Sequence, residues 1–349
     1  MRTKAEVIRE HYGVVPNMME VLTTRHSSLM QYIEPPLDQW TTLKLPYEAP
    51  EHPGIPSMDE IERALQDNRI SARHGLRPVC RVGKCVVKIA DRNILQEAEM
   101  LLYLQEHSKV RAPKLYAAFI NPTNDLCYMV MEFIEGDTLD MDKWLALDDE
   151  AQTIICSKLS EQLKLLRSIP CEGEGYYGRV YRQGWSPLSF LRIRYKEMLG
   201  PYNTFDDFIS AMYVCTEHDL ATQNLADEFF PEEVEFLSKF KHVLGKTRGF
   251  KPVLTFLDLK WDNLIVRPIK GEDGEAIKDW EITLIDWHDC GWLPAFMQFA
   301  ALEARIMLFG EDDAKFRQRV YANFEEAYTY TEELKFLEDG RYHANYTFI

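Results

Sequence analysis

Two stretches of this chain are the most informative about its fold and chemistry, Leu254-Thr-Phe-Leu-Asp-Leu-Lys-Trp-Asp-Asn-Leu-Ile-Val266 and Thr283-Leu-Ile-Asp-Trp-His-Asp289. They place an aspartate, an asparagine five residues later and a second aspartate beside apolar residues typical of β-strands. An aspartate can accept a hydroxyl proton and orient a nucleophile, while asparagine and aspartate oxygens bind Mg²⁺ well. The pattern therefore predicts phosphoryl transfer, with Asp258 as the base and with Asn263 and Asp286 as metal ligands.

Length and composition exclude several classes of protein. The 349 residues, of which 46% are hydrophobic, are enough for two lobes with a substantial core. No apolar run is long enough to span a membrane, and the charged, periodic N-terminus differs from a signal peptide. A net charge of −16 without a basic stretch argues against nucleic acid or an anionic membrane as a partner. Nothing in the sequence indicates an oligomeric state.

The seven cysteines lie mostly in apolar runs and lack the paired spacing of zinc sites. We therefore expect reduced thiols, as in a cytoplasmic protein.

The chain divides into three parts by pattern. Residues 1–56 form an N-terminal extension, rich in proline after a short helical start, which either covers a site or packs as a structural segment. Residues 57–134 alternate strands with a helix, and residues 135–349 are mainly helical. The predicted fold is α+β and bilobal, with a small antiparallel-sheet N-lobe carrying one helix, a larger helical C-lobe, and a cleft between them.

The expected elements follow from periodicity. In the N-lobe, Ser57 and Glu60 have capping-box spacing at the start of a helix, and strand patterns at 79–89 and 114–131 form two hairpins on either side of a helix at 94–106. In the C-lobe we expect helices around 155–166 and at 187–199, 204–214, 231–245 and 295–309, with strands at 253–266 and 280–286.

Lys88 lies two residues after Val86 on an apolar strand, so both side chains are expected on one face. A lone lysine at a strand end is usually an exposed charge. An acid on the next helix changes this, because a Lys–Glu ion pair would direct the ammonium toward the α- and β-phosphates of ATP. Glu97 and Glu99 lie on opposite sides of that helix, and we favour Glu97 because it directly precedes the apolar stripe.

The segment Met131–Gly136 joins the two lobes, and adenine could form hydrogen bonds with the backbone around Glu132 and Ile134. The same pattern also occurs wherever a strand simply ends in a turn. Lys260, two residues after Asp258, either neutralises the γ-phosphate or is simply exposed. Four apolar side chains are expected to enclose the purine, and they would also be ordinary core residues: Val86, Met131, Ile265 and Ile285.

These motifs together resemble the aminoglycoside phosphotransferase/choline kinase family, with its protein-kinase-like fold, and in particular its fungal-type small-molecule members. The likeness covers about residues 60–330 and rests on these segments: V-V-K-I at Lys88, Q-E-A-E-M-L at Glu97, M-E-F-I-E-G at 131–136, L-D-L-K-W-D-N-L-I-V at 257–266, and L-I-D-W-H-D-C-G-W-L-P at 284–294. The resemblance implies the roles already given to Asp258, Asn263 and Asp286, an ATP-positioning Lys88–Glu97 pair, and an adenine-binding hinge at 132–134.

The chain departs from the family pattern in three places. Phe256 stands where the family usually has a histidine, two residues before the catalytic aspartate. That histidine supports the loop more than the chemistry, so we expect the site to survive. No G-x-G-x-x-G occurs between 68 and 84, and D-L-K is closer to protein kinases than to antibiotic kinases.

The leading hypothesis is a small-molecule kinase that uses ATP, or GTP, with Mg²⁺. A protein kinase is less favoured because no activation segment or A-P-E motif follows Asp286. A non-catalytic nucleotide-binding module is the second alternative. The acceptor pocket is expected in the insert around 176–230, and the acids near it favour an amine-bearing acceptor. The candidates for its lining are Tyr176, Tyr177, Trp261, Trp287, Trp292, Asp137, Asp206 and Asp207, most of which would also fit a core or a charged surface.

Overall fold

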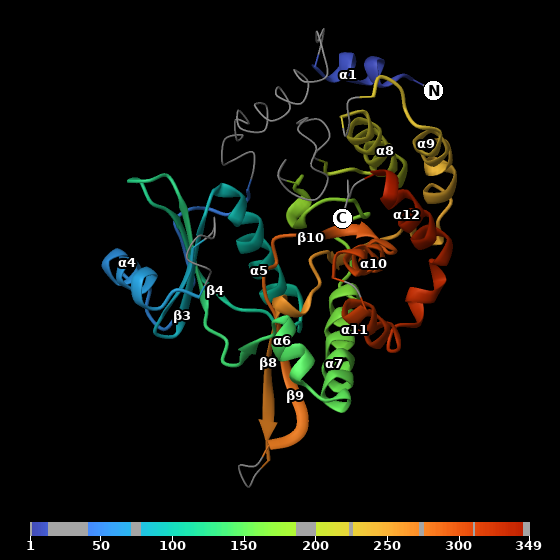
Figure 1. Cartoon of the computed structure of the whole chain (residues 1–349). Helices are drawn as coiled ribbons and strands as arrows, with labels where there is room; N and C mark the ends of the chain where they lie inside the picture. The colour runs from blue at the N-terminus through green and yellow to red at the C-terminus, as the bar shows by residue number, and fades with distance from the viewer. Residues whose placement is uncertain are drawn as a thin grey trace.

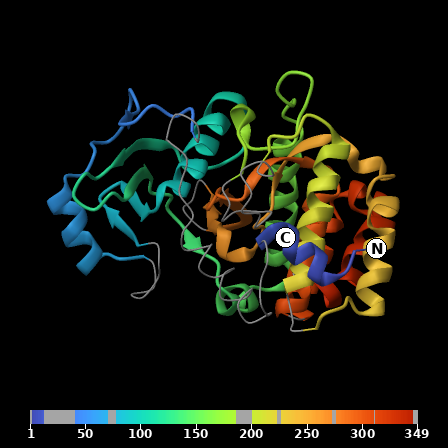
Figure 2. The same cartoon turned by 90° about the horizontal axis from the view of Figure 1, so that it is seen from above.

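The computed structural model describes residues 2–12, 41–70, 78–185, 200–222, 226–271, 276–309 and 311–344. The described chain forms two lobes, with the sheet-containing lobe beside a larger, mainly helical lobe in both views (Figures 1 and 2). This arrangement confirms the predicted α+β fold. No helix in the described part has the length and apolar character that crossing a bilayer requires.

The N-lobe is built on a five-stranded antiparallel sheet in the order β1-β4-β5-β3-β2. Its strands are β1 (Tyr47–Glu48), β2 (Val79–Val82), β3 (Cys85–Ala90), β4 (Leu115–Ile120) and β5 (Cys127–Glu132). Both predicted hairpins are present, and the first turns at Gly83, whose positive φ of 57° suits a residue without a side chain.

Two helices accompany this sheet, α4 (Met58–Asp67) and α5 (Leu95–His107). The predicted capping box begins α4, because Ser57 accepts from the backbone of Glu60 while the Glu60 carboxylate accepts from the backbone of Ser57. The second helix, α5, packs on β4 and β5 and faces the C-lobe.

The N-terminal extension contacts both lobes. Its strand β1 pairs with the edge of β4, with Tyr47 opposite Ala118. Its helix α1 (Lys4–Tyr12) lies against α8 (Phe205–Thr222) of the C-lobe (Figure 1). The buried ammonium of Lys4 is 3.2 Å from a carboxylate oxygen of Glu233 on α9 (Pro231–Leu244). Residues 1–56 are therefore packed against the two lobes at both described ends.

The C-lobe helices are α6 (Met141–Ala146), α7 (Asp149–Arg167), α8 (Phe205–Thr222), α9 (Pro231–Leu244), α10 (Met297–Phe309), α11 (Glu311–Tyr321) and α12 (Thr331–Ala344). The helix predicted at 204–214 continues to Thr222, because buried residues such as Cys215 and Leu220 extend its packed face. The helix predicted at 187–199 lies outside the described residues.

The C-lobe strands are β6 (Asp137–Thr138), β7 (Pro252–Phe256), β8 (Leu264–Lys270), β9 (Ala276–Leu284) and β10 (Cys290–Pro294). They form the sheets β6-β8-β9 and β7-β10. The prediction of one strand over 253–266 was wrong, since residues 257–263 form a loop between β7 and β8. The Asn263 side chain closes this loop by donating to the backbone oxygen of Asp258 at 2.8 Å. The later strand ends at Leu284, so Asp286 lies beyond it.

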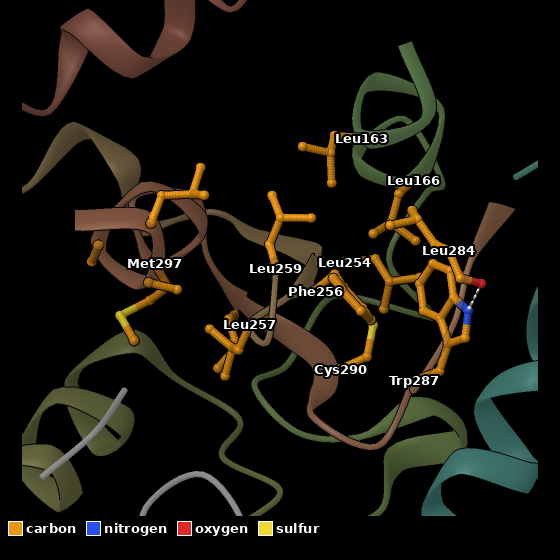
Figure 3. Packing of buried hydrophobic residues seen from close by; sticks show 14 of the residues in the cluster. Leu163, Leu166, Leu254, Phe256, Leu257, Leu259, Leu284, Trp287, Cys290 and Met297 are labelled. Carbon is orange, nitrogen blue, oxygen red and sulfur yellow. Dashed lines mark hydrogen bonds between the residues drawn. The ribbon is translucent and has the colours of Figure 1, made fainter. Parts of the chain in front are cut away.

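The core below these strands joins α7 to both sheets. Leu163 and Leu166 of α7 lie over Leu254 and Leu284, and the indole of Trp287 donates to the backbone oxygen of Leu284 at 2.9 Å (Figure 3). All seven cysteines fall in the described residues, and no disulfide joins any of them there.

Candidate active site

A triad of charges, with Lys88 and Glu97 buried and Asp286 half-buried, lies where β3, α5 and the turn after β9 meet. The ammonium of Lys88 is 2.6 Å from Glu97 on α5 and also 2.6 Å from Asp286. Val86 and Lys88 alternate along β3 with residues of the opposite face, so their side chains lie on the same face of the sheet. Lys88 is thus paired with Glu97 and also with Asp286, which lies 198 residues further along the chain.

The charges of this triad stabilise one another. Burial lowers the pKa of Lys88, but Glu97 and Asp286 outweigh this and leave its pKa above the ordinary value. Burial likewise raises the pKa of Asp286, while the adjacent Lys88 more than offsets it, so that its pKa is lowered. Near neutral pH the lysine is charged and Asp286 is ionised.

The backbone around Asp286 is unusual. Asp286 has a φ of 63°, in the left-handed region that a non-glycine residue enters at a cost of about 1–3 kcal/mol. Just before it, the N–H of Ile285 donates to the backbone oxygen of Asn263 at 3.0 Å. This hydrogen bond fastens the two predicted metal-binding segments to each other.

A second cluster lies in the loop between β7 and β8. Asp258 accepts from the Asn263 side-chain nitrogen at 2.9 Å and lies 2.9 Å from the ammonium of Lys260. The amide nitrogen of Asn263 is thereby engaged on its own loop, which leaves the amide oxygen as its atom for a metal. Both Asp258 and Lys260 are partly exposed, as a residue that meets a substrate must be.

Phe256 stands where the family usually has a histidine, and a nearby glutamine, Gln298, binds its backbone. Its ring is fully buried and packs edge-on against Trp287 with centroids 4.7 Å apart (Figure 3). The buried side chain of Gln298 on α10 accepts from the Phe256 N–H at 3.1 Å and donates to its C=O at 2.8 Å. The backbone entering the Asp258 loop is therefore fixed by an amide, without a histidine.

The hinge between the lobes is held at its start by backbone hydrogen bonds and at its end by a close approach to β8. Glu132 and Phe133 donate their N–H groups to Lys114 and Lys84, whereas the backbone N–H of Ile134 has no backbone partner in the described ranges. Gly136 has a φ of 145°, and a Cβ there would lie 2.7 Å from the Val266 oxygen, so the hinge lies tightly against β8.

A cavity of about 760 Å³ opens beside this hinge and has the size of a small-molecule site. Its walls include residues 132–135 and Ile265, but none of Lys88, Asp258 and Asp286 lines it. The cavity therefore lies at the hinge, and the charged side chains of Lys88, Asp258 and Asp286 are not part of its walls.

The remaining predicted residues are distributed as follows. Val86 and Met131 are cross-strand neighbours on β3 and β5, and Ile265 lies opposite Thr283 on β9. Of the four residues expected around the purine, only Ile265 lines the cavity at the hinge; Val86, Met131 and Ile285 do not. The aromatic candidates for the acceptor pocket are all buried in the core: Tyr176, Tyr177, Trp261, Trp287 and Trp292. The three acidic candidates are exposed: Asp137, Asp206 and Asp207. The region expected to carry the phosphate-covering loop includes residues 71–77, outside the described part.

Sequence reasoning missed some residues that shape the site. Gln298 lies 42 residues from Phe256, and no motif marks it. His288 was visible inside the D-W-H-D motif, and its ring, which lies 3.1 Å from a carboxylate oxygen of Asp289, is buried beside Gln96 of α5.

One known family model covers most of the chain. A family model described as the phosphotransferase enzyme family matches residues 74–337, more than half of the chain. The chain belongs to this phosphotransferase family. A search of curated proteins gave no match.

Solved structures of aminoglycoside phosphotransferases resemble this family member in fold. APH(4)-Ia is 13% identical with a TM-score of 0.54, over 81% of this chain and 89% of that chain. APH(2'')-Ib with bound ADP is 15% identical with a TM-score of 0.50, over 82% and 88% of the two chains. A GDP and kanamycin complex of APH(2'')-IIia is 14% identical with a TM-score of 0.50, over 80% and 86%. The comparisons confirm the predicted family resemblance and the bilobal kinase-like fold.

Proposed function

We propose that this chain is an ATP-dependent phosphotransferase that transfers the γ-phosphate to a hydroxyl group of a small molecule. One observation carries the proposal. Segments from both lobes bring Lys88, Glu97 and Asp286 into direct contact, while Asp258 and Asn263 are hydrogen-bonded in the neighbouring loop. Each residue has a defined part in phosphoryl transfer, and the family match covers all of them.

In this proposal Asp258 receives the proton of the acceptor hydroxyl. Its carboxylate is partly exposed, and its orientation is fixed by Asn263 on one side and Lys260 on the other. When the hydroxyl approaches, Lys260 is placed to neutralise charge on the transferring phosphoryl group. The contribution of the protein is thus positioning and charge compensation more than covalent chemistry.

Nucleotide binding is assigned to the other cluster. The ammonium of Lys88, held by Glu97, faces the α- and β-phosphates, and the backbone around Glu132 and Ile134 contacts the base. Val86, Met131, Ile265 and Ile285 provide the apolar surfaces on either side of it. The solved relatives include complexes with ADP and with GDP, so both ATP and GTP are donors to test.

The donor atoms fit a magnesium ion. Asp286 offers a carboxylate and Asn263 an amide oxygen, which are hard oxygen ligands, and Mg²⁺ typically takes its remaining ligands from phosphates and water. In the described residues, no three His, Cys, Asp or Glu side chains gather as a metal group, consistent with a site that relies on the nucleotide. When held by Asp286 and Asn263, the ion would supply positive charge that offsets the negative charge developing on the transferring phosphoryl group.

The acceptor is proposed to be a small molecule, with amine-bearing compounds first. The chain carries a net charge of −16, and Asp137 is exposed beside the hinge. Such a field attracts cations, and one relative is solved with kanamycin. A protein acceptor is disfavoured because β10 begins only four residues after Asp286, with no intervening activation segment.

The proposal is tested by thermal unfolding with and without Mg-ATP or Mg-GTP. A nucleotide at about one hundred times its dissociation constant should add about 2.7 kcal/mol of stability. Asp286→Asn should abolish this magnesium-dependent gain, whereas Asp258→Asn should keep the gain and lose phosphate transfer to an acceptor. Equal loss of binding in both variants would refute the division of roles.

A wild-type chain that is stabilised by neither nucleotide would refute the proposal as a whole. Stabilisation by Mg-ATP without any Asp258-dependent turnover would instead identify a non-catalytic nucleotide-binding module.

A further inference from the structure

The helix that carries Glu97 is also bound from its opposite side. Glu99, two residues later on α5, is 1% exposed, and one of its carboxylate oxygens lies 2.9 Å from the guanidinium of Arg179. Its other oxygen accepts from the hydroxyl of Thr41 and from the backbone N–H of Thr42, both at 2.7 Å. One buried carboxylate therefore joins α5 to the N-terminal extension and to the C-lobe.

Arg179 is held by a tightly built segment. The guanidinium also donates to the backbone oxygen of Gly184 at 2.6 Å, and the backbone N–H of Arg179 donates to Gln183 at 2.8 Å. Gly178, its neighbour, exchanges two backbone hydrogen bonds with Trp292 of β10, at 2.7 and 3.1 Å. The arginine is thus anchored to the strand that follows the Asp286 turn.

The backbone around Arg179 is packed so closely that Gly178 and Gly291 have no room for a Cβ atom. A Cβ at Gly291 would lie 2.7 Å from the Gly178 oxygen, and a Cβ at Gly178 would lie 2.7 Å from the Gln183 oxygen. Tyr181 and Arg182 both have positive φ angles, 57° and 56°, which cost about 1–3 kcal/mol each in non-glycine residues. A segment that retains two such residues is held in place by its surroundings.

The charge of the pair is fully desolvated. Burial lowers the pKa of Arg179, and Glu99 beside it opposes this effect. A buried ion pair often contributes little net stability compared with apolar residues of the same volume, and in some proteins its role is instead to fix one conformation. Its value to the protein is therefore in the position of α5.

We propose that Arg179 is a positioning residue for the active site. Through Glu99 it fixes α5 relative to β10, and so keeps Glu97 against Lys88 and Lys88 against Asp286. The proposal rests on the phosphotransferase function for its catalytic consequence, while its structural part is independent of it. The threonine contacts of Glu99 give the N-terminal extension a share in the same task.

The test compares two double variants. Arg179→Met/Glu99→Gln removes both charges, so neither is left buried alone, and the glutamine oxygen can still accept from Thr41. Arg167→Met/Glu326→Gln removes a second arginine–glutamate pair, joined at 2.6 Å within the C-lobe, whose arginine is also almost fully buried and whose glutamate is 37% exposed. Each protein is examined by amide hydrogen exchange of residues 95–107 without ligand, and by kcat and KM for ATP hydrolysis.

We expect faster exchange in α5 only for the Arg179/Glu99 variant, with a similar thermal midpoint in both. Its kcat should fall by about a hundredfold, because small misplacements of catalytic groups have effects of that order. The control should stay within about twofold of the wild type in kcat.

Unchanged exchange in α5 would overturn the proposal whatever the rate, and so would an equal loss of kcat in the control variant. If the wild type neither binds nor hydrolyses Mg-ATP, the proposed function fails, and the exchange comparison alone then decides whether the pair fixes α5.

Discussion

Replacing Lys88 by methionine tests whether the Lys88–Glu97 pair is as desolvated as its burial indicates. The side chains of Lys88 and Glu97 are 10% and 2% exposed, and Lys88→Met would leave the Glu97 carboxylate buried without its cation. Removing one partner of a buried ion pair costs about 3–5 kcal/mol. Asp286 adds little to this loss, because its side chain is 38% exposed and water can solvate it.

The double variant Lys88→Met/Glu97→Gln separates stability from function. With both charges removed, most of the lost stability should return, since an apolar or neutral pair of similar volume is often as stable. Nucleotide binding should not return, because the ammonium assigned to the α- and β-phosphates is then missing. Urea unfolding at pH 7 measures the first effect, and the Mg-ATP-induced shift of the thermal midpoint measures the second.

An exposed lysine provides the control. Lys143 and Asp137 are 48% and 74% exposed and 3.5 Å apart, so Lys143→Met should cost less than about 1 kcal/mol. A Lys88→Met variant no less stable than this control would show that water reaches the Glu97 carboxylate. The same conclusion would follow if the double variant were as unstable as the single one, and the reasoning from burial would then be wrong.

Three further predictions concern the supports of the site. Gln298→Leu leaves the buried N–H and C=O of Phe256 unpaired, and should cost about 1–3 kcal/mol per group in urea unfolding. The pKa of Asp286 is lowered in the folded protein, so its contribution to stability is present above about pH 4 and is lost as the pH falls through the folded pKa. In a plot of unfolding free energy against pH, Asp286→Asn should therefore reduce the loss of stability at acid pH. Ser57→Ala removes the cap of α4, and should cost about 1 kcal/mol without changing the Mg-ATP-dependent shift.

Much of the fold followed from local pattern. The β2–β3 hairpin, the start of α4 at Ser57 and the helix at α5 lie where period, turn residues and capping predicted them. These features depend on residues within a few positions of one another, so a short stretch of sequence is enough to predict them. The strand expected at 253–266 failed for the opposite reason, because a side-chain hydrogen bond from Asn263 interrupts a run whose composition alone favours a strand.

The catalytic motifs were equally local, and Asp258, Asn263 and Asp286 could be picked out because phosphoryl transfer requires those groups at that spacing. Only the tertiary structure decided how they meet. Contact between Lys88 and Asp286 joins residues 198 apart, and the choice of Glu97 over Glu99 depends on which face of α5 meets β3 and which meets Arg179. Packing between distant segments depends on how the whole core fits together, and the spacing of residues within one helix or strand does not determine it.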